Sequence, residues 1–461
     1  MTGRVAPHEE SAAGLARRLG LFDATMIVMG GIVGSGIFMN PYVVARQVHT
    51  PFMILAVWVM GGLIALLGAF VYAELAARRP KVGGQYAYIR EAYHPMVAFI
   101  YGWGLLLVTQ TGGMAAVAVT FARYFAELTR VSVADWVIAT LALAGLTVIN
   151  CLGVKAGSTA QNVLMILKIG AIAALVACGL FWAKNPYSGA SPGYAAPLLD
   201  RPVSMDLLTA VGAAMVPVLF AYGGWQTACF IAAEVREPRK TLPRGLFIGV
   251  LGVIVLYLAV NFVCLRVLGP SGLAATSAPA SAVMKMVLGD LGGRLIAAGI
   301  AISTLGFLSQ GILTAPRVYY AMAEDGLFFK SVAWLQPRTR VPVVAIALQG
   351  VCAIVIALSG RYEQILNYVV SADWVFFGLS ASCVFVLRRR DGETQFSRLS
   401  EYNIPGHPFT TALFVATCLF IVINTVYKYP GNSVIALGIM MAGLPVYFFW
   451  RWRTRRQTSQ Q

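Results

Sequence analysis

Gly30-Gly31-Ile32-Val33-Gly34-Ser35-Gly36-Ile37-Phe38 lies inside the first long apolar segment of the chain, residues 21–47. Its four glycines and one serine make a poor helix, because each glycine costs about 1 kcal/mol relative to alanine. In a membrane, an interrupted helix leaves backbone groups that cost several kcal/mol each unless protein, water or a ligand satisfies them. The second half-helix then offers free N–H groups to a carboxylate, and the first half offers free carbonyls to an ammonium group. One interruption therefore provides complementary partners for a zwitterion.

The same glycines also suit a close crossing of two packed membrane helices, where small residues let backbones approach. This segment alone does not separate a binding site from a packing surface. A second segment, described below, favours binding.

Composition places the chain in a membrane. Of its 461 residues, 58% are hydrophobic and 12% are charged, and a soluble protein of this length cannot bury so much apolar surface. Apolar runs repeatedly reach the roughly 18–20 residues that cross the hydrocarbon core. We therefore predict an all-α, polytopic membrane protein with twelve transmembrane helices, at residues 21–47, 52–77, 95–128, 133–153, 160–183, 205–234, 245–268, 291–322, 341–360, 363–388, 409–428 and 432–450.

The basic residues orient these spans. They cluster on alternate connections, as in Arg17, Arg18, Arg78, Arg79, Arg236, Arg239, Arg388, Arg389, Arg390, Arg451 and Arg453. Positively charged loops stay on the cytoplasmic side, so both termini are expected there. The net charge of +16 is explained by this orientation and does not require a nucleic acid partner.

Lys168 is an ionisable residue inside the predicted fifth span, 160–183. It lies about eight residues into the span, or about 12 Å at 1.5 Å per residue, farther than a lysine stem reaches to the surface. Charged groups at this depth usually serve function. We therefore expect a functional role for Lys168.

A second interruption is expected in the sixth span, in the sequence Val216-Pro217-Val218-Leu219-Phe220-Ala221-Tyr222-Gly223-Gly224-Trp225-Gln226-Thr227. Proline and paired glycines break the helix near mid-span, as the glycines do in the first span. Interrupted helices that open each of two five-helix halves indicate an inverted repeat with a substrate site at the membrane midplane. The predicted organisation is a tail, two repeats, a helix pair and a second tail, at 1–20, 21–184, 205–388, 409–450 and 451–461.

Two further segments leave alternatives open. Residues 81–93 are too polar to cross a membrane and suit a short interfacial helix on the cytoplasmic side, with a cytoplasmic gate as the alternative. Asp373, in the tenth span, either faces the external vestibule or makes a structural pair.

Other chemistry is poorly represented in the sequence. The seven cysteines lie in or at the ends of apolar spans, without metal-ligand spacing, and are expected to be buried small hydrophobic residues. The four histidines lie at or beyond span ends, which argues against a membrane-embedded enzyme. We expect neither a metal nor a cofactor. A channel remains a competing class, distinguished by ion currents without saturable uptake.

The chain resembles the amino acid–polyamine–organocation superfamily, and within it the bacterial relatives of the L-amino-acid transporter branch. The resemblance covers about residues 15–450. Its landmarks occur in order along the chain: Gly34-Ser35-Gly36-Ile37-Phe38, Gly83-Gly84-Gln85-Tyr86, Asn150 with Gly153-Val154-Lys155, Phe220-Ala221-Tyr222-Gly223-Gly224-Trp225, Glu234 with Glu237-Pro238, and Arg317 with Asp325-Gly326.

The resemblance implies a LeuT-like fold, with two inverted five-helix repeats, two additional C-terminal helices and discontinuous first and sixth helices. It implies an amino acid transporter of a bacterial cytoplasmic membrane that works by alternating access. The implied substrate contacts are the N–H groups of Ser35, Gly36 and Ile37 for the carboxylate and the carbonyls of Ile32, Phe220 and Gly223 for the ammonium, with Ala221 and Thr227 beside them. Phe220 is expected to cover the substrate as an aromatic gate.

Lys168 falls on the family's fifth-span lysine, which occupies the place of sodium in sodium-coupled relatives. Transport is therefore expected to be independent of sodium. A fixed lysine charge suits exchange, and a titrating lysine suits proton symport, which stays as the alternative.

Human members of this branch pair with a heavy chain through a cysteine between the third and fourth helices. The corresponding residues here, 129–135, contain no cysteine, so we expect the chain to work alone as a monomer. The absence of an acid beside the interruption in the sixth span favours neutral L-amino acids. A cationic amino acid or polyamine antiporter stays as an alternative.

Overall fold

The computed structural model describes residues 14–183, 198–359, 362–399, 402–428 and 430–458. Within these ranges the regular elements are helices. One isolated β-bridge also pairs Leu19 with Val235. Positions 1–13 of the predicted N-terminal tail lie outside the described residues. So does the stretch 184–197, between the predicted fifth and sixth spans.

Eight helices in the described part of the chain are long and apolar enough to cross a membrane, namely Pro51–Arg78, Pro95–Thr129, Val154–Trp182, Met205–Glu234, Pro238–Ala275, Pro279–Glu324, Phe409–Tyr427 and Ser433–Arg456. Three shorter apolar helices accompany them, namely Leu21–Ile32, Asp135–Cys151 and Val343–Leu358. These lengths and compositions agree with the predicted all-α membrane protein. The exact number of twelve spans stays a prediction.

The first half of the chain forms α1 Leu21–Ile32, α2 Gly36–Met39, α3 Pro41–Ala45, α4 Pro51–Arg78, α5 Gln85–Ala92, α6 Pro95–Gly104, the π-helical turn η1 Leu105–Thr109, α7 Gln110–Thr129, α8 Asp135–Cys151, α9 Val154–Ala177 and the π-helical turn η2 Cys178–Trp182. Proline opens α4 and α6, where its missing N–H is not needed and its φ suits a helix. The helix α9 begins at Val154, before the predicted 160, directly after Gly153, whose φ is +148°.

The second half forms α10 Met205–Ala221, the 3₁₀ helix η3 Trp225–Glu234, α11 Pro238–Ala275, α12 Pro279–Thr314, α13 Pro316–Glu324, the 3₁₀ turn η4 Lys330–Ala333, α14 Val343–Leu358, α15 Tyr362–Leu399, α16 Phe409–Lys428, α17 Pro430–Met441 and α18 Gly443–Thr458. The helices α11 and α12 are each kinked at a glycine with positive φ, Gly269 and Gly289, so each range joins two helical pieces and extends past the predicted span.

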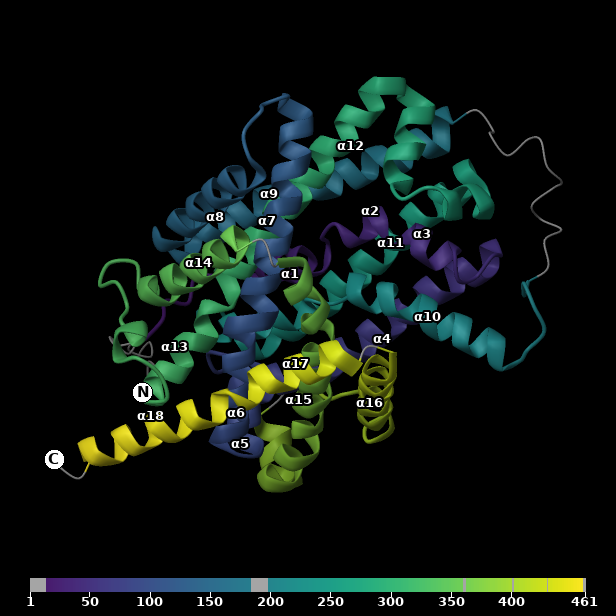
Figure 1. Cartoon of the computed structure of the whole chain (residues 1–461). Coiled ribbons are helices and arrows are strands. Elements are labelled where there is room, and N and C mark those ends of the chain that lie inside the picture. Colours follow the sequence, from purple (N-terminus) through teal and green to yellow (C-terminus); the bar gives the residue numbers. More distant parts are fainter. Residues whose placement is uncertain (1–13, 184–197, 360–361, 400–401, 429, 459–461) are drawn as a thin grey trace, which may run out of the picture.

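The short helix α1 lies at the centre of the bundle. It packs against α9, α11, α12 and η3. Figure 1 shows α1 among these helices, while the C-terminal half of α18 runs outward past the bundle. The interrupted segment that begins at α1 is therefore enclosed by protein, which a broken membrane helix requires.

The helix α5 lies within the segment 81–93 that was expected to be a short helix. Tyr86, Tyr88 and Ile89 are fully buried, and α5 packs against α6 and α15. Its aromatic residues thus contact protein. The interfacial position and the cytoplasmic gate both stay predictions.

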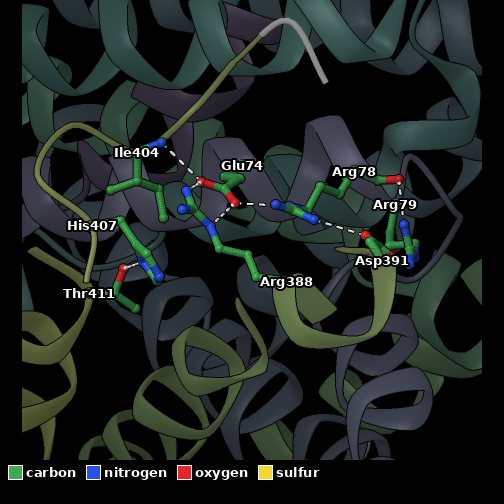
Figure 2. Close-up of polar contacts among 8 residues, drawn as sticks. All are labelled: Glu74, Arg78, Arg79, Arg388, Asp391, Ile404, His407 and Thr411. Carbon is green, nitrogen blue, oxygen red and sulfur yellow. Dashed lines mark hydrogen bonds and ion pairs between the residues drawn. The ribbon is translucent and has the colours of Figure 1, made fainter. Parts of the chain in front are cut away.

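A buried carboxylate joins the end of α4 to α15 and to the segment that follows it (Figure 2). Glu74 is fully buried and accepts hydrogen bonds from Arg78 Nε at 2.8 Å and from Arg388 Nη2 at 2.6 Å. The backbone N–H of Ile404 donates to the same carboxylate at 2.9 Å. One anion therefore holds three segments that are far apart in sequence.

Asp391 extends this contact along α15. Its carboxylate accepts from Arg78 Nη1 at 2.8 Å and from Arg79 Nη2 at 2.6 Å (Figure 2). Arg390 Nη2 donates to the carbonyl of Ala92, at the end of α5, at 3.1 Å. Together with Glu74, these contacts fasten the last turns of α15 to α4 and α5.

We expect Glu74→Gln to lower stability by about 3–5 kcal/mol, because removing one partner of a buried ion pair leaves the other charge uncompensated. The measurement is the thermal melting of the purified protein in detergent. The matched control is Glu127→Gln, the same change at an exposed position. Equal melting temperatures for the two variants would contradict this role for Glu74.

Candidate functional site

The first helix is interrupted within the predicted stretch. α1 ends at Ile32, Val33 has extended backbone angles of φ −74° and ψ 98°, and α2 begins at Gly36. Asn40 joins α2 to α3 and donates from Nδ2 to the carbonyl of Pro217 in α10 at 2.8 Å. The segment after the interruption is thus tied to the other interrupted helix.

The sixth predicted span is interrupted as well. α10 ends at Ala221, and η3 begins at Trp225. Gly224 has φ +107°, in the left-handed region that favours glycine. Pro217 lies inside α10 one turn before the interruption.

The two interruptions touch each other. A Cβ atom added to Gly31 would lie 2.6 Å from the carbonyl oxygen of Gly224, and one added to Gly224 would lie 2.0 Å from that of Gly31. Neither position accepts a larger residue without a backbone shift. The sequence left open whether the glycines mark an interrupted helix or a close helix crossing. In the structure they do both.

Buried side chains satisfy the carbonyls freed at the end of α1. Lys168, fully buried on α9, donates from Nζ to the carbonyl of Val33 at 2.6 Å, with that of Gly30 at 3.5 Å. Ser303, on α12, donates to the carbonyl of Gly34 at 3.1 Å. Lys168 thus lies against the interrupted helix, where the sequence placed it.

Tyr257, on α11, bridges the two interruptions. Its hydroxyl lies 3.0 Å from the carbonyl of Ile32 and 3.1 Å from that of Ala221. Its ring packs edge-on against Trp58 at 5.7 Å. Sequence reasoning missed Tyr257, because a tyrosine in an apolar span carries no signal that separates it from other buried aromatics.

The second interruption is satisfied locally. Thr227 Oγ1 donates to the carbonyl of Gly224 at 2.7 Å, and Gln226 Oε1 accepts from the N–H of Gly224 at 3.1 Å. Gln310, on α12, donates to Thr227 Oγ1. Thr227 is therefore held in one orientation from both sides.

One cavity lies between the interrupted helices. Its lining residues come from α1, α2, α10 and η3, from α5 to α7, and from α12 and α15. Those predicted as site residues are Ile32, Ser35, Gly36, Phe220, Ala221, Gly223 and Thr227. Phe220 is 45% exposed and lines the cavity, and its role as an aromatic gate stays a prediction.

Two predicted site residues do not line this cavity. The side chain of Ile37 is fully buried, and its predicted contact is through the backbone N–H. Lys168 lies behind α1 and contacts its carbonyls.

The sequence left other lining residues unassigned. Gln85 of α5 and Tyr101 of α6 line the cavity. So does Asp373, whose role the sequence left open between the vestibule and a structural pair. These contacts depend on how helices distant in sequence pack, which no local pattern specifies.

Gly306, on α12, makes the room that Lys168 occupies. A Cβ atom there would lie 2.4 Å from Lys168 Cε and 2.9 Å from its Nζ. The position of the ammonium group therefore depends on a glycine that the sequence analysis did not single out.

Clustered metal ligands are absent from the described residues. These residues contain no group of three or more His, Cys, Asp or Glu side chains placed to hold a metal ion. All seven cysteines are described, are unpaired, and are buried or half-buried. The cysteines thus behave as the small apolar residues that the sequence predicted.

Comparison with known proteins gives relatives along nearly the whole chain. The family model for amino acid permease matches residues 19–449. The serine/threonine exchanger SteT of Bacillus subtilis (strain 168) is 30% identical over 446 residues, covering 94% of this chain and 97% of that protein. The large neutral amino acids transporter small subunit 2 of Homo sapiens is 27% identical, covering 95% and 81%.

A third relative, the cystine/glutamate transporter of Homo sapiens, is 26% identical over 453 residues, covering 97% of this chain and 88% of that protein. These matches confirm the resemblance to the amino acid–polyamine–organocation superfamily that the sequence landmarks indicated. The chain belongs to the amino acid permease family.

Proposed function

We propose that the chain exchanges L-amino acids across a membrane by alternating access and without sodium. The observation that carries this proposal is the cavity lined by both interrupted helices. The relatives are named as exchangers or transporters of amino acids. Their names favour a transporter over a membrane enzyme.

The substrate carboxylate is assigned to the backbone N–H groups of Ser35, Gly36 and Ile37. In the described part of the chain, these three groups have no backbone acceptor, and α2 directs its positive end toward them. An anion at this place satisfies groups that the protein leaves open.

The substrate ammonium is assigned to the carbonyls of Ile32, Phe220 and Gly223. Tyr257 takes one lone pair of the Ile32 carbonyl and leaves the other, since each carbonyl oxygen accepts two hydrogen bonds. Ala221 and Thr227 lie beside these groups in the cavity wall.

Lys168 acts in this proposal as a fixed cation behind α1. Its contacts with carbonyls of Gly30 and Val33 supply the positive charge that a sodium ion would otherwise bring. A fixed charge couples no ion to uptake, which suits exchange. A titrating Lys168 would instead give proton symport, which is the alternative.

Helix contacts support the inverted repeat over 21–184 and 205–388. Helices at corresponding places in the two halves touch, as α4 touches α11, α7 touches α12 and α8 touches α14. The contact of α9 with α12 has its counterpart in the contact of α7 with α15. This pattern is expected when a two-fold axis in the membrane plane relates the halves.

The basic end of α4, with its partners on α15, is assigned to the cytoplasmic side of a bacterial inner membrane, together with both termini. We also propose that the chain works as a monomer without a heavy chain, since residues 129–135 lack a cysteine. In this proposal the chain needs no partner chain, whereas the human relative is named as a small subunit.

The first experiment is uptake of labelled amino acids into proteoliposomes that hold the purified protein. We expect rapid uptake when the vesicles are preloaded with unlabelled amino acid and almost none into empty vesicles. Replacing sodium with choline is expected to leave the rate unchanged. Uptake into empty vesicles that requires an inward proton gradient would establish the symport alternative and contradict exchange.

We expect Gly306→Ala to slow exchange by about tenfold or more, because the added methyl displaces the Lys168 ammonium from Val33 and a hydrogen bond to a charged group is at least that strong. The measurement is the exchange rate in proteoliposomes, with the size-exclusion elution profile in detergent as the check of folding. Both are compared with those of Gly170→Ala. A Cβ atom at Gly170 has no neighbour within 4 Å. Wild-type exchange in the Gly306 variant would contradict the fixed-cation role of Lys168.

A further inference from the structure

Of the side chains that line the cavity in the described part of the chain, Asp373 alone is ionisable to a carboxylate, and none is a lysine or arginine. It lies on α15, one residue before Trp374 and four before Phe377, which line the same wall. The other polar lining groups are amides, hydroxyls and backbone atoms. The cavity therefore carries one negative charge whenever Asp373 is ionised.

The protein supplies no partner for this carboxylate within the residues described, because the hydrogen bonds and ion pairs there do not include Asp373. Tyr101, in the same cavity, and the buried Lys168 are both engaged elsewhere. Tyr101 donates its hydroxyl to Gln85 Oε1 at 3.0 Å, and Lys168 donates to carbonyls of α1. Among the described side chains none balances the charge of Asp373, which leaves that role to a group that enters the cavity.

An unpaired carboxylate away from bulk water is costly, and a cation beside it removes much of that cost. The α-ammonium of a bound amino acid cannot be this cation, because the interrupted helices are assigned to bind it. The α-carboxylate beside it also cancels its charge. A positive group at the end of the substrate side chain remains. The aromatic faces of Trp374, Phe377 and Tyr101 in the same cavity also favour a cation.

We propose that Asp373 is the specificity-determining residue for the substrate side chain, and that the cavity prefers amino acids with a cationic side chain over neutral ones of the same length. This proposal rests on the proposed amino acid exchange and names its substrate class. It replaces the sequence-based preference for neutral amino acids, which considered acids near the sixth-span interruption and left out the acid on the tenth span.

The test uses purified protein in preloaded proteoliposomes, with a labelled neutral amino acid as tracer. Unlabelled lysine and norleucine are compared as competitors of the tracer, and so are ornithine and norvaline. Each pair shares a carbon chain and differs in the terminal ammonium. We expect the cationic member to compete about tenfold or more strongly, as hydrogen bonds to charged groups allow. In Asp373→Asn, that ratio is expected to fall to about one while tracer exchange continues.

Two variants keep the test interpretable. Asp373→Glu retains the charge and is expected to retain the preference for lysine and ornithine, even if Asp373→Asn folds poorly. Asp206→Asn removes a negative charge from an exposed position on α10. This variant is expected to show the same competition ratios as the wild type.

Four results would overturn the proposal. Equal competition by lysine and norleucine in the wild-type protein would reject the cationic class while leaving amino acid exchange in place. A preference that survives Asp373→Asn would reject the role of Asp373. Loss of all tracer exchange in well-folded Asp373→Asn would assign the carboxylate to the substrate ammonium. Absence of exchange of any amino acid by the wild type would instead reject the proposed function itself.

Discussion

The hydrogen bonds that satisfy the end of α1 are the constraint on which the site depends. Backbone carbonyls released inside a membrane are tolerated only when other groups bind them. Lys168, Ser303 and Tyr257 bind the carbonyls of Val33, Gly34 and Ile32, and they come from α9, α12 and α11. Three helices thus hold open an interruption whose N–H groups remain available for a ligand.

The two interruptions form one unit. Gly31 and Gly224 bring their backbones into contact, and Tyr257 reaches a carbonyl on each side. The backbones of the two interrupted helices are therefore in direct contact. In the proposed alternating access, both walls of the cavity belong to this pair of segments.

Local sequence predicted the parts of this arrangement that local chemistry dictates. Glycines and proline marked both interruptions, and the depth of Lys168 in its span marked it as functional. Tyr257, Gly306 and Asp373 were unassigned because their roles arise from helices that meet only in the folded chain. The helix in the polar segment 81–93 was predicted, but the burial of its aromatic residues against α6 and α15 was not, for the same reason.

The central claim is that the interrupted helices bind both charged ends of an amino acid. Binding of the best-exchanged amino acid to the purified protein should be compared with binding of its amide, which lacks the carboxylate, and of its N-acetyl form, which lacks the ammonium. The account predicts that each analogue binds about a hundredfold or more weakly, because buried polar groups lose their partner. Affinities equal to that of the parent amino acid would contradict it.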